Sequence, residues 1–185
     1  MSRIMNRTIL TLAFAPFMVA TAAAQNLTFQ DVVKKVQAHV EPAVVKRGAA
    51  VNWTLTVDIA DGWHTYPTRQ NDPKASSYVN RIKFAEQSGA VFVGDLKEPV
   101  GTDKDEDGSK VTMIEGTATW ERTIVIRPDA KPGKVRIKVP ATILACADRC
   151  LPPKTVTTEI ELTISDDPPV AVDPKYQKAL ESPAK

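Results

Sequence analysis

Residues 51–59 alternate strictly between apolar and polar side chains. The apolar members are Val51, Trp53, Leu55, Val57 and Ile59. A period of two places these side chains on one face of a β-strand and the polar residues between them on the other. Asp61-Gly62 follows with residues that are typical of a turn. The sequence therefore predicts a half-buried strand, which needs neighbouring strands to complete a sheet.

Similar alternation recurs along the chain between short turn signals. It is clear in residues 117–126, 135–139 and 156–164, and weaker in residues 78–84 and 90–93. Turn residues separate these segments at Asn71-Asp72-Pro73, Ser88-Gly89, Asp107-Gly108 and Arg127-Pro128-Asp129. Several short strands without a long helical pattern predict an all-β fold, namely an antiparallel β-sandwich.

The stretch from Thr28 to Val40 fits two structures. Its first apolar residues suit one face of a helix, and Thr28 with Asp31 resembles a capping box. Residues 36–40 instead alternate like a strand that ends at Glu41-Pro42. We favour a strand for Val36–Val40.

The N-terminal segment has the pattern of a secretory signal peptide over residues 1–24. Arg3 and Arg7 precede an apolar run from Ile9 to Ala20, and small residues follow at 22–24. The apolar run is shorter than the roughly 20 residues that cross a bilayer, and no later segment is long enough. We therefore expect an exported protein, periplasmic or secreted, whose mature chain has no membrane span.

The remaining chain divides into one domain and a tail. Residues 25–166 contain all the predicted strands and are expected to form one β-sandwich domain. Prolines are frequent after Asp166 and large apolar residues are rare. We therefore expect residues 167–185 to form a Pro-rich, extended and flexible tail.

Charge balance and residue counts exclude several kinds of site. The chain has 24 Lys and Arg against 22 Asp and Glu, and two of the basic residues lie within residues 1–24. The remainder is neutral and has no basic cluster, which argues against a nucleic-acid partner. Two cysteines and two histidines are too few for a four-thiolate or a three-histidine metal site. We expect no metal ion and no cofactor.

Cys146 and Cys150 are the only cysteines and lie within Ala145–Pro153, between two predicted strands. A short hairpin connection can bring their Cα atoms within the roughly 4.4–6.8 Å that a disulfide requires. Such a small loop makes a weak staple, worth roughly 2 kcal/mol, but it can make an accessible redox pair. Arg149 would stabilise a thiolate and Asp148 would oppose it. The residues alone support a structural and a redox role about equally.

Two other motifs contain candidate functional residues. Residues 103–108 imitate the start of an EF-hand calcium loop, but its twelfth position is Ile114 and Glu115 falls one place late. A solvated acidic turn is the better interpretation. His64 and Tyr66 follow the turn at Gly62 and alternate onto one face, where they could border a site.

The segment Gly62-Trp63-His64-Thr65-Tyr66, with Cys146-Ala147-Asp148 and Cys150-Leu151-Pro152-Pro153, resembles the periplasmic N-terminal domain of the disulfide interchange reductase DsbD. The resemblance extends from about Val33 to Ile164. It implies an immunoglobulin-like fold and a thiol–disulfide exchange module that passes electrons to or from thioredoxin-fold partners. It further implies that Cys146 and Cys150 are the redox residues, the catalytic pair, bordered by His64, Tyr66, Asp148 and Arg149.

The same resemblance implies that Met113, Ile114 and Glu115 form a cap loop that shields the disulfide. The best-known members have a longer spacing between the cysteines and an aromatic cap residue, where this chain has Ile114. They also have a membrane electron-transfer domain and a C-terminal thioredoxin domain that this sequence lacks. We therefore expect the electron donor to be a separate protein.

A second function class stays open, a non-catalytic immunoglobulin-like binding module with a structural disulfide. In immunoglobulin domains the structural disulfide joins the two sheets across many residues. Cys146 and Cys150 are instead neighbours in one connection, and this spacing favours the redox interpretation. The sequence does not distinguish which of the two sulfurs is attacked.

Overall fold

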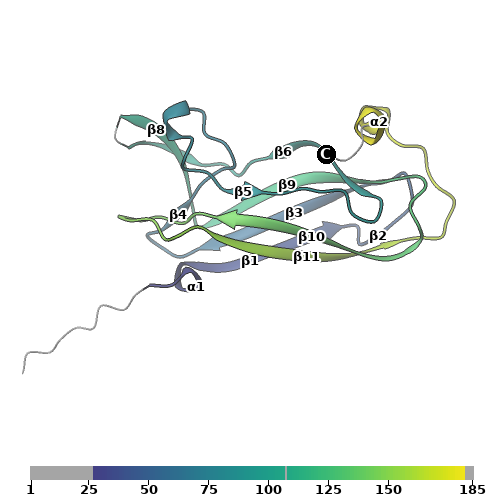
Figure 1. Cartoon of the computed structure of the whole chain (residues 1–185), viewed down its shortest axis with the longest axis horizontal. Helices are drawn as coiled ribbons and strands as arrows, with labels where there is room; N and C mark the ends of the chain where they lie inside the picture. Colours follow the sequence, from purple (N-terminus) through teal and green to yellow (C-terminus); the bar gives the residue numbers. More distant parts are fainter. Residues whose placement is uncertain (1–26, 107, 182–185) are drawn as a thin grey trace, which may run out of the picture.

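The computed structural model describes residues 27–106 and 108–181. The predicted signal peptide at residues 1–24 lies outside this range. The described chain forms an immunoglobulin-like antiparallel β-sandwich, with two four-stranded sheets face to face and a smaller sheet at one end (Figure 1). The predicted fold class is confirmed.

The first sheet has the strand order β1-β3-β9-β6, and all its neighbouring strands are antiparallel. Its strands are β1 (Val33–Glu41), β3 (Ala50–Ile59), β6 (Ala90–Lys97) and β9 (Thr117–Ile126). β3 contains the strictly alternating segment. Trp53, Leu55 and Val57 are fully buried there, while the residues between them are partly exposed.

The second sheet has the strand order β2-β11-β10-β5. Its strands are β2 (Val44–Val45), β5 (Arg81–Ile82), β10 (Gly133–Ile143) and β11 (Lys154–Ile164). β10 and β11 are antiparallel along their whole length, and β2 runs parallel to the end of β11. The strand expected over residues 78–84 is limited to β5, because the Asn80 N–H donates to the Pro67 carbonyl rather than to a neighbouring strand.

The apolar faces of the two sheets enclose the main core of the domain. Trp53 and Trp120 are both completely buried in it. The Trp53 ring meets Phe84 and Phe92 edge to face, with centroids 5.3 and 5.7 Å apart. Aromatic pairs in this geometry add roughly 0.5–1.5 kcal/mol to the stabilisation that burial provides. These aromatic contacts lie in the main core and help to hold the two sheets together.

Both structures considered for residues 28–40 are present, one after the other. Helix α1 (Phe29–Val32) begins after Thr28, whose N–H and hydroxyl both donate to Asp31 Oδ2 at 2.7 Å. This capping box satisfies backbone donors that a helix start leaves unpaired. The chain then enters β1, so the strand favoured for Val36–Val40 is confirmed and begins earlier, at Val33.

Residues 103–106 of the acidic run lie in a strand rather than in a turn. β7 (Thr102–Glu106) pairs with β8 (Ser109–Glu115) as an antiparallel hairpin. All the residues of β7 are exposed, so no buried face marked this strand in the sequence. The hairpin belongs to the small third sheet, which lies on the left in Figure 1.

The segment predicted as an extended tail contains a helix, α2 (Pro174–Glu181). Asp173 Oδ1 accepts the Lys175 N–H at 3.0 Å, and proline is well suited to the first helical position because its missing N–H is not needed there. Arg127 Nη1 donates to the Leu180 carbonyl at 2.8 Å, which holds the helix against the sandwich. Among the described residues, no helix has the length and apolar character needed to cross a membrane.

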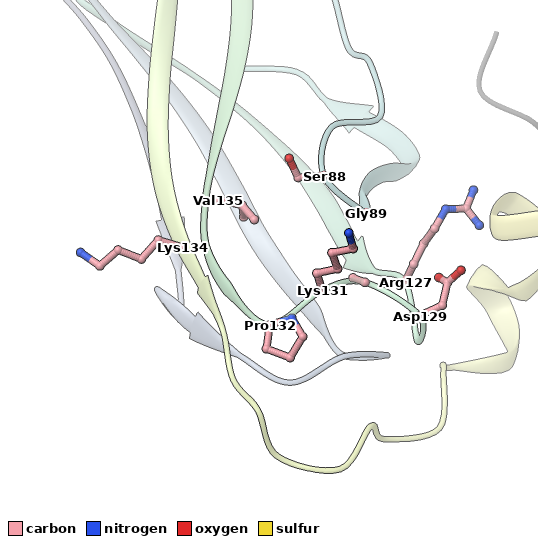
Figure 2. A pocket seen from close by; sticks show the side chains of 9 residues that line it. Ser88, Gly89, Arg127, Asp129, Lys131, Pro132, Lys134 and Val135 are labelled. Carbon is pink, nitrogen blue, oxygen red and sulfur yellow. The ribbon is translucent and has the colours of Figure 1, made fainter.

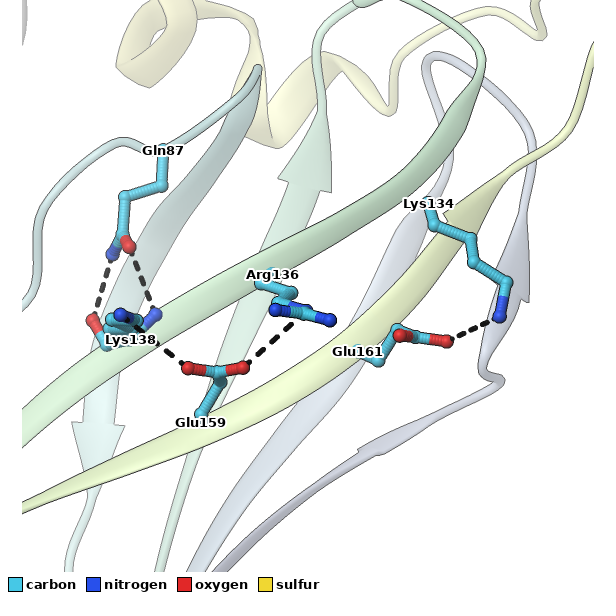
Figure 3. A network of polar contacts seen from close by, with 6 residues as sticks. All are labelled: Gln87, Lys134, Arg136, Lys138, Glu159 and Glu161. Atoms are coloured by element: carbon cyan, nitrogen blue, oxygen red, sulfur yellow. Dashed lines mark hydrogen bonds and ion pairs between the residues drawn. The ribbon is translucent and has the colours of Figure 1, made fainter.

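The outer face of β10 and β11 carries a row of polar contacts (Figure 3). The residues in it are Gln87, Lys134, Arg136, Lys138, Glu159 and Glu161. Lys134 Nζ lies 2.8 Å from Glu161 Oε1, and the Gln87 amide bonds both the carbonyl and the N–H of Lys138. Exposed ion pairs of this kind contribute about 0–1 kcal/mol each. We interpret this face as ordinary hydrated surface.

Candidate functional site

The third sheet carries the cysteine pair at its edge. Its strand order is β4-β8-β7, and β4 consists of His64–Thr65. Beyond β4 the ladder continues through single bridges from His64 to Cys146 and from Cys146 to Cys150. His64 and Cys146 exchange both backbone hydrogen bonds, at 2.9 and 3.0 Å. Glu115, His64, Cys146 and Cys150 therefore form one row across the sheet.

Cys146 and Cys150 form a disulfide within the connection between β10 and β11. These two strands stay paired as far as Ile143 and Lys154. The connection therefore covers residues 144–153, close to the predicted segment Ala145–Pro153. The two Cα atoms are 3.9 Å apart, closer than the predicted range.

The two cysteines differ in exposure, which the sequence did not indicate. Cys146 is only 2% exposed and packs in a small apolar cluster. This cluster consists of Tyr66, Ala75, Val111, Met113 and Cys146. Cys150 is exposed to solvent. Exchange requires a thiolate to reach one sulfur of the disulfide, and Cys150 is the more accessible of the two cysteines.

A pocket of about 220 Å³ opens over the disulfide. It is lined by His64, Tyr66, Tyr78, Glu106, Met113, Cys146, Ala147, Asp148, Arg149 and Cys150. The residues expected to border the pair are therefore brought together from β4, its continuation and the disulfide loop. Sequence reasoning did not identify Tyr78 and Glu106. Glu106 comes from β7, and the Asp107-Gly108 turn was the one signal that could have indicated a hairpin there.

The segment expected to form a cap loop is instead the end of β8. Met113 lines the disulfide pocket, whereas Ile114 is 3% exposed within the main core. Glu115 is exposed, and its carboxylate lies 2.7 Å from Lys104 Nζ. Because alternate residues of a strand point to opposite faces, Ile114 cannot cover the sulfurs. Of the three residues, only Met113 lies at the pocket.

His64 and Tyr66 form a hydrogen-bonded pair beside the disulfide. His64 Nε2 lies 2.9 Å from the Tyr66 hydroxyl, and the two rings meet edge to face. Burial raises the pKa of Tyr66, so its hydroxyl stays protonated at neutral pH. Burial is also the main cause that lowers the pKa of His64; Lys104 lowers it further, while Glu115 and Glu106 act in the opposite direction. His64 is therefore a neutral imidazole at pH 7.

Residues 29–162 match the family model described as thiol:disulfide interchange protein DsbD, N-terminal. The chain belongs to this family. Members of the DsbD N-terminal family take part in thiol–disulfide exchange, and this chain has a disulfide-bonded cysteine pair within the matched region.

Two solved structures are similar to this DsbD-family chain. The N-terminal domain of DsbD from Neisseria meningitidis, in the reduced form, has 22% identity, covers 76% of this chain and 91% of its own, and gives a TM-score of 0.42. The N-terminal periplasmic domain of ScsB from Proteus mirabilis has 18% identity, covers 77% of this chain and 50% of its own, and gives a TM-score of 0.40. No curated protein matches the chain.

A larger pocket, of about 470 Å³, lies beside the turn that leads into β10 (Figure 2). The cysteines follow the other end of that strand. The pocket lining includes Ser88, Arg127, Asp129 and Lys131, and it has no cysteine or histidine. Arg127 Nε already lies 2.7 Å from Glu86 Oε1. This pocket therefore offers no group for disulfide exchange, in contrast to the pocket over Cys146 and Cys150.

Proposed function

We propose that this DsbD-family domain is an exported thiol–disulfide exchange module that passes electrons through Cys146 and Cys150, to or from thioredoxin-fold partners. The observation that carries the proposal is the unequal exposure of the pair. Cys150 is exposed at a pocket, and Cys146 is buried behind it. The main core of the sandwich contains neither cysteine, so the disulfide is not needed to fill it.

Cys150 is the sulfur that a reducing partner attacks. The partner's thiolate bonds to Cys150 Sγ, the bond between the two cysteines breaks, and Cys146 leaves with the bonding electron pair. The partner's second thiolate then attacks the partner's own sulfur in the mixed disulfide and releases Cys150. Two electrons and two protons have then passed to the domain. The reverse sequence transfers them to an oxidised partner.

The side chains around Cys150 suit contact with another protein. Asp148 and Arg149 are exposed beside it and carry opposite charges, so they offer hydrogen bonds of both kinds to a docking surface. Met113 is buried at the pocket and shields the inner sulfur. A partner therefore reaches Cys150 without first displacing the sandwich core.

The module is proposed to work in the periplasm or outside the cell. The signal-peptide pattern of residues 1–24 supports export, and a disulfide persists best in an oxidising compartment. Residues 25–166 would form the exchange domain. Residues 167–185 would follow it as a C-terminal segment that includes α2.

The test uses a thioredoxin whose second active-site cysteine is replaced by serine and whose first carries a thionitrobenzoate group. Cys146→Ser leaves Cys150 as the single thiol, and Cys150→Ser leaves the buried Cys146. We expect Cys146→Ser to displace thionitrobenzoate and form a stable mixed disulfide at least tenfold faster than Cys150→Ser. The double variant is the control and should form none.

Two results would contradict the proposal. Equal rates in the two single variants would mean that Cys150 is not the preferred point of attack. If neither variant is captured, and reduced thioredoxin leaves the wild-type disulfide intact for hours, a binding module with a structural disulfide replaces the redox module.

A further inference from the structure

Cys146 needs a proton acceptor that the cysteine pair does not provide. When the reduced domain is oxidised, Cys146 must attack as a thiolate. Its side chain lies in the apolar cluster with Tyr66 and Met113 and is 2% exposed. An unpaired charge in such surroundings is costly, and water has little access to it. The Cys146 proton must therefore go to a nearby base as the sulfur attacks.

His64 is placed to be that base. It lies directly opposite Cys146 in a hydrogen-bonded pair, with both backbone bonds formed. Side chains of such a pair project to the same face of the sheet, with Cβ atoms roughly 4.5–5.5 Å apart. The His64 and Cys146 side chains both line the pocket over the disulfide. In the tautomer that carries its proton on Nε2, the imidazole donates to the Tyr66 hydroxyl oxygen, and Nδ1 is left as the acceptor for the Cys146 proton.

The geometry points to His64 as the residue that exchanges a proton with Cys146 during disulfide exchange, with Tyr66 holding the imidazole in place. This inference rests on the proposed redox role of the two cysteines. It adds a proton route to a reaction in which the cysteines supply the electrons. A general acid or base in this position typically changes a rate by about 10²–10⁴-fold.

The oxidation of the domain then has two steps. The Cys150 thiolate attacks an acceptor disulfide, forms a mixed disulfide and releases one acceptor thiolate. The Cys146 thiol next gives its proton to the His64 imidazole while its sulfur attacks Cys150, and the second acceptor sulfur leaves with the bonding electrons. In the reverse direction the His64 imidazolium returns that proton to Cys146 as it is released.

The charges around His64 come from three elements. They are Lys104 and Glu106 of β7, Glu115 of β8, and Asp148 and Arg149 of the disulfide loop. Burial and Lys104 lower the pKa of His64, Glu115 and Glu106 act in the opposite direction, and the net shift is downward. The imidazole is therefore unprotonated at neutral pH and is able to accept a proton.

The test follows oxidation of the reduced chain by glutathione disulfide, with acid quenching and mass spectrometry of the products. The variants are His64→Phe and His64→Gln, and Tyr66→Phe removes the partner of the imidazole. His39→Phe is the matched control, because His39 is the only other histidine and is exposed on β1. Thermal unfolding checks that each variant is folded, and the glutamine variant retains a polar side chain if the phenylalanine variant is unstable.

We expect wild type and His39→Phe to form the intramolecular disulfide with little glutathione adduct. Both His64 variants should form the adduct on Cys150 at the normal rate but resolve it on the order of 10²-fold more slowly. In wild type, resolution should rise with pH as the imidazole loses its proton. In the His64 variants the resolution rate should not rise in this pH range. It should rise only at the higher pH where the Cys146 thiol itself ionises. The resolution rate of Tyr66→Phe should lie between those of wild type and the His64 variants.

The inference is overturned if both His64 variants resolve the glutathione adduct at the wild-type rate and with the wild-type pH profile. A uniform slowing with an unchanged pH profile also overturns it, because that result indicates a structural role alone. Glutathione disulfide replaces the protein partner, so this outcome does not depend on thioredoxin capture. If capture fails while the His64 effect is present, the partner assignment is wrong and the proton route stands.

Discussion

Asn80 holds the start of the disulfide loop through Leu144. The Leu144 N–H donates to Asn80 Oδ1 at 2.8 Å, although the two residues are 64 positions apart in the chain. The Asn80 amide also donates to the Tyr66 carbonyl at 2.6 Å and to Thr65 Oγ1 at 2.9 Å. Asn80 is completely buried. One side chain therefore joins the disulfide loop to β4 and to the residue that follows it.

Replacing Asn80 should loosen the disulfide loop and destabilise the domain. Asn80→Ala leaves the Leu144 N–H without its partner, and each buried group left unpaired costs roughly 1–3 kcal/mol. We expect a lower urea midpoint and faster reduction of the disulfide by dithiothreitol. Asn52→Ala, at an exposed position of β3, is the control and should change neither. An unchanged midpoint in Asn80→Ala would show that the loop is held by other contacts.

Removing the disulfide should leave the sandwich folded. The bond joins residues only four positions apart, so the chain-entropy loss is small. We expect Cys146→Ser with Cys150→Ser to lower the free energy of unfolding by no more than roughly 2 kcal/mol, with a cooperative urea transition. Loss of cooperative unfolding in the double variant would instead identify the bond as a structural staple.

Shortening Met113 and Ile114 to alanine should have different effects. Met113→Ala opens the pocket over the sulfurs and should speed reduction by dithiothreitol severalfold. Ile114→Ala removes a side chain from the main core and should cost about 2–5 kcal/mol in urea unfolding, with little change in the reduction rate under native conditions. Similar reduction rates for the two variants would contradict the shielding role given to Met113.

The ion pair between Glu86 and Arg127 should make stability depend on pH. The Arg127 guanidinium lowers the pKa of Glu86 in the folded protein. The stabilisation is therefore present above the unfolded pKa of the carboxyl and is lost as the pH falls through the lower folded value. We expect Glu86→Gln to lose roughly 1 kcal/mol at pH 7 and less at about pH 3, because protonation of the carboxyl has begun to remove the contribution of the ion pair there.

Urea unfolding at both pH values measures this difference. Glu41→Gln, at the exposed end of β1, is the control and should match wild type throughout. If Glu86→Gln loses the same free energy at both pH values, its effect comes from packing rather than from the charge.

The strands of the sandwich could be predicted because burial imposes a period of two. β3 alternates between a buried and a hydrated face, and the sequence shows this directly. The same reasoning missed β7. All its side chains are exposed to water, so its sequence has no need to alternate between apolar and polar residues. The α2 helix was missed because the tail is rich in proline and poor in large apolar residues, although Asp173-Pro174 is a common way to begin a helix.

The sequence indicated many of the residues that line the disulfide pocket but not their arrangement. The spacing of Cys146 and Cys150 indicated a local disulfide. Their unequal exposure depends on which residues the third sheet packs over the loop, and those residues are distant in sequence. In the sequence, Asn80 is a polar residue within the weakly alternating residues 78–84. Its role depends on Leu144, which only the folded chain brings within reach.

Met113 and Ile114 are neighbours on β8 but belong to different hydrophobic clusters, one beneath the disulfide and one within the sandwich. The smaller cluster is able to open locally while the packing of the larger one stays intact. Local opening of the smaller one exposes far less apolar surface than global unfolding, and regions of this kind exchange their amide hydrogens at lower free energy. If a partner binds at Cys150 as proposed, it needs to open only the small cluster around Cys146, while the main core of the sandwich stays closed.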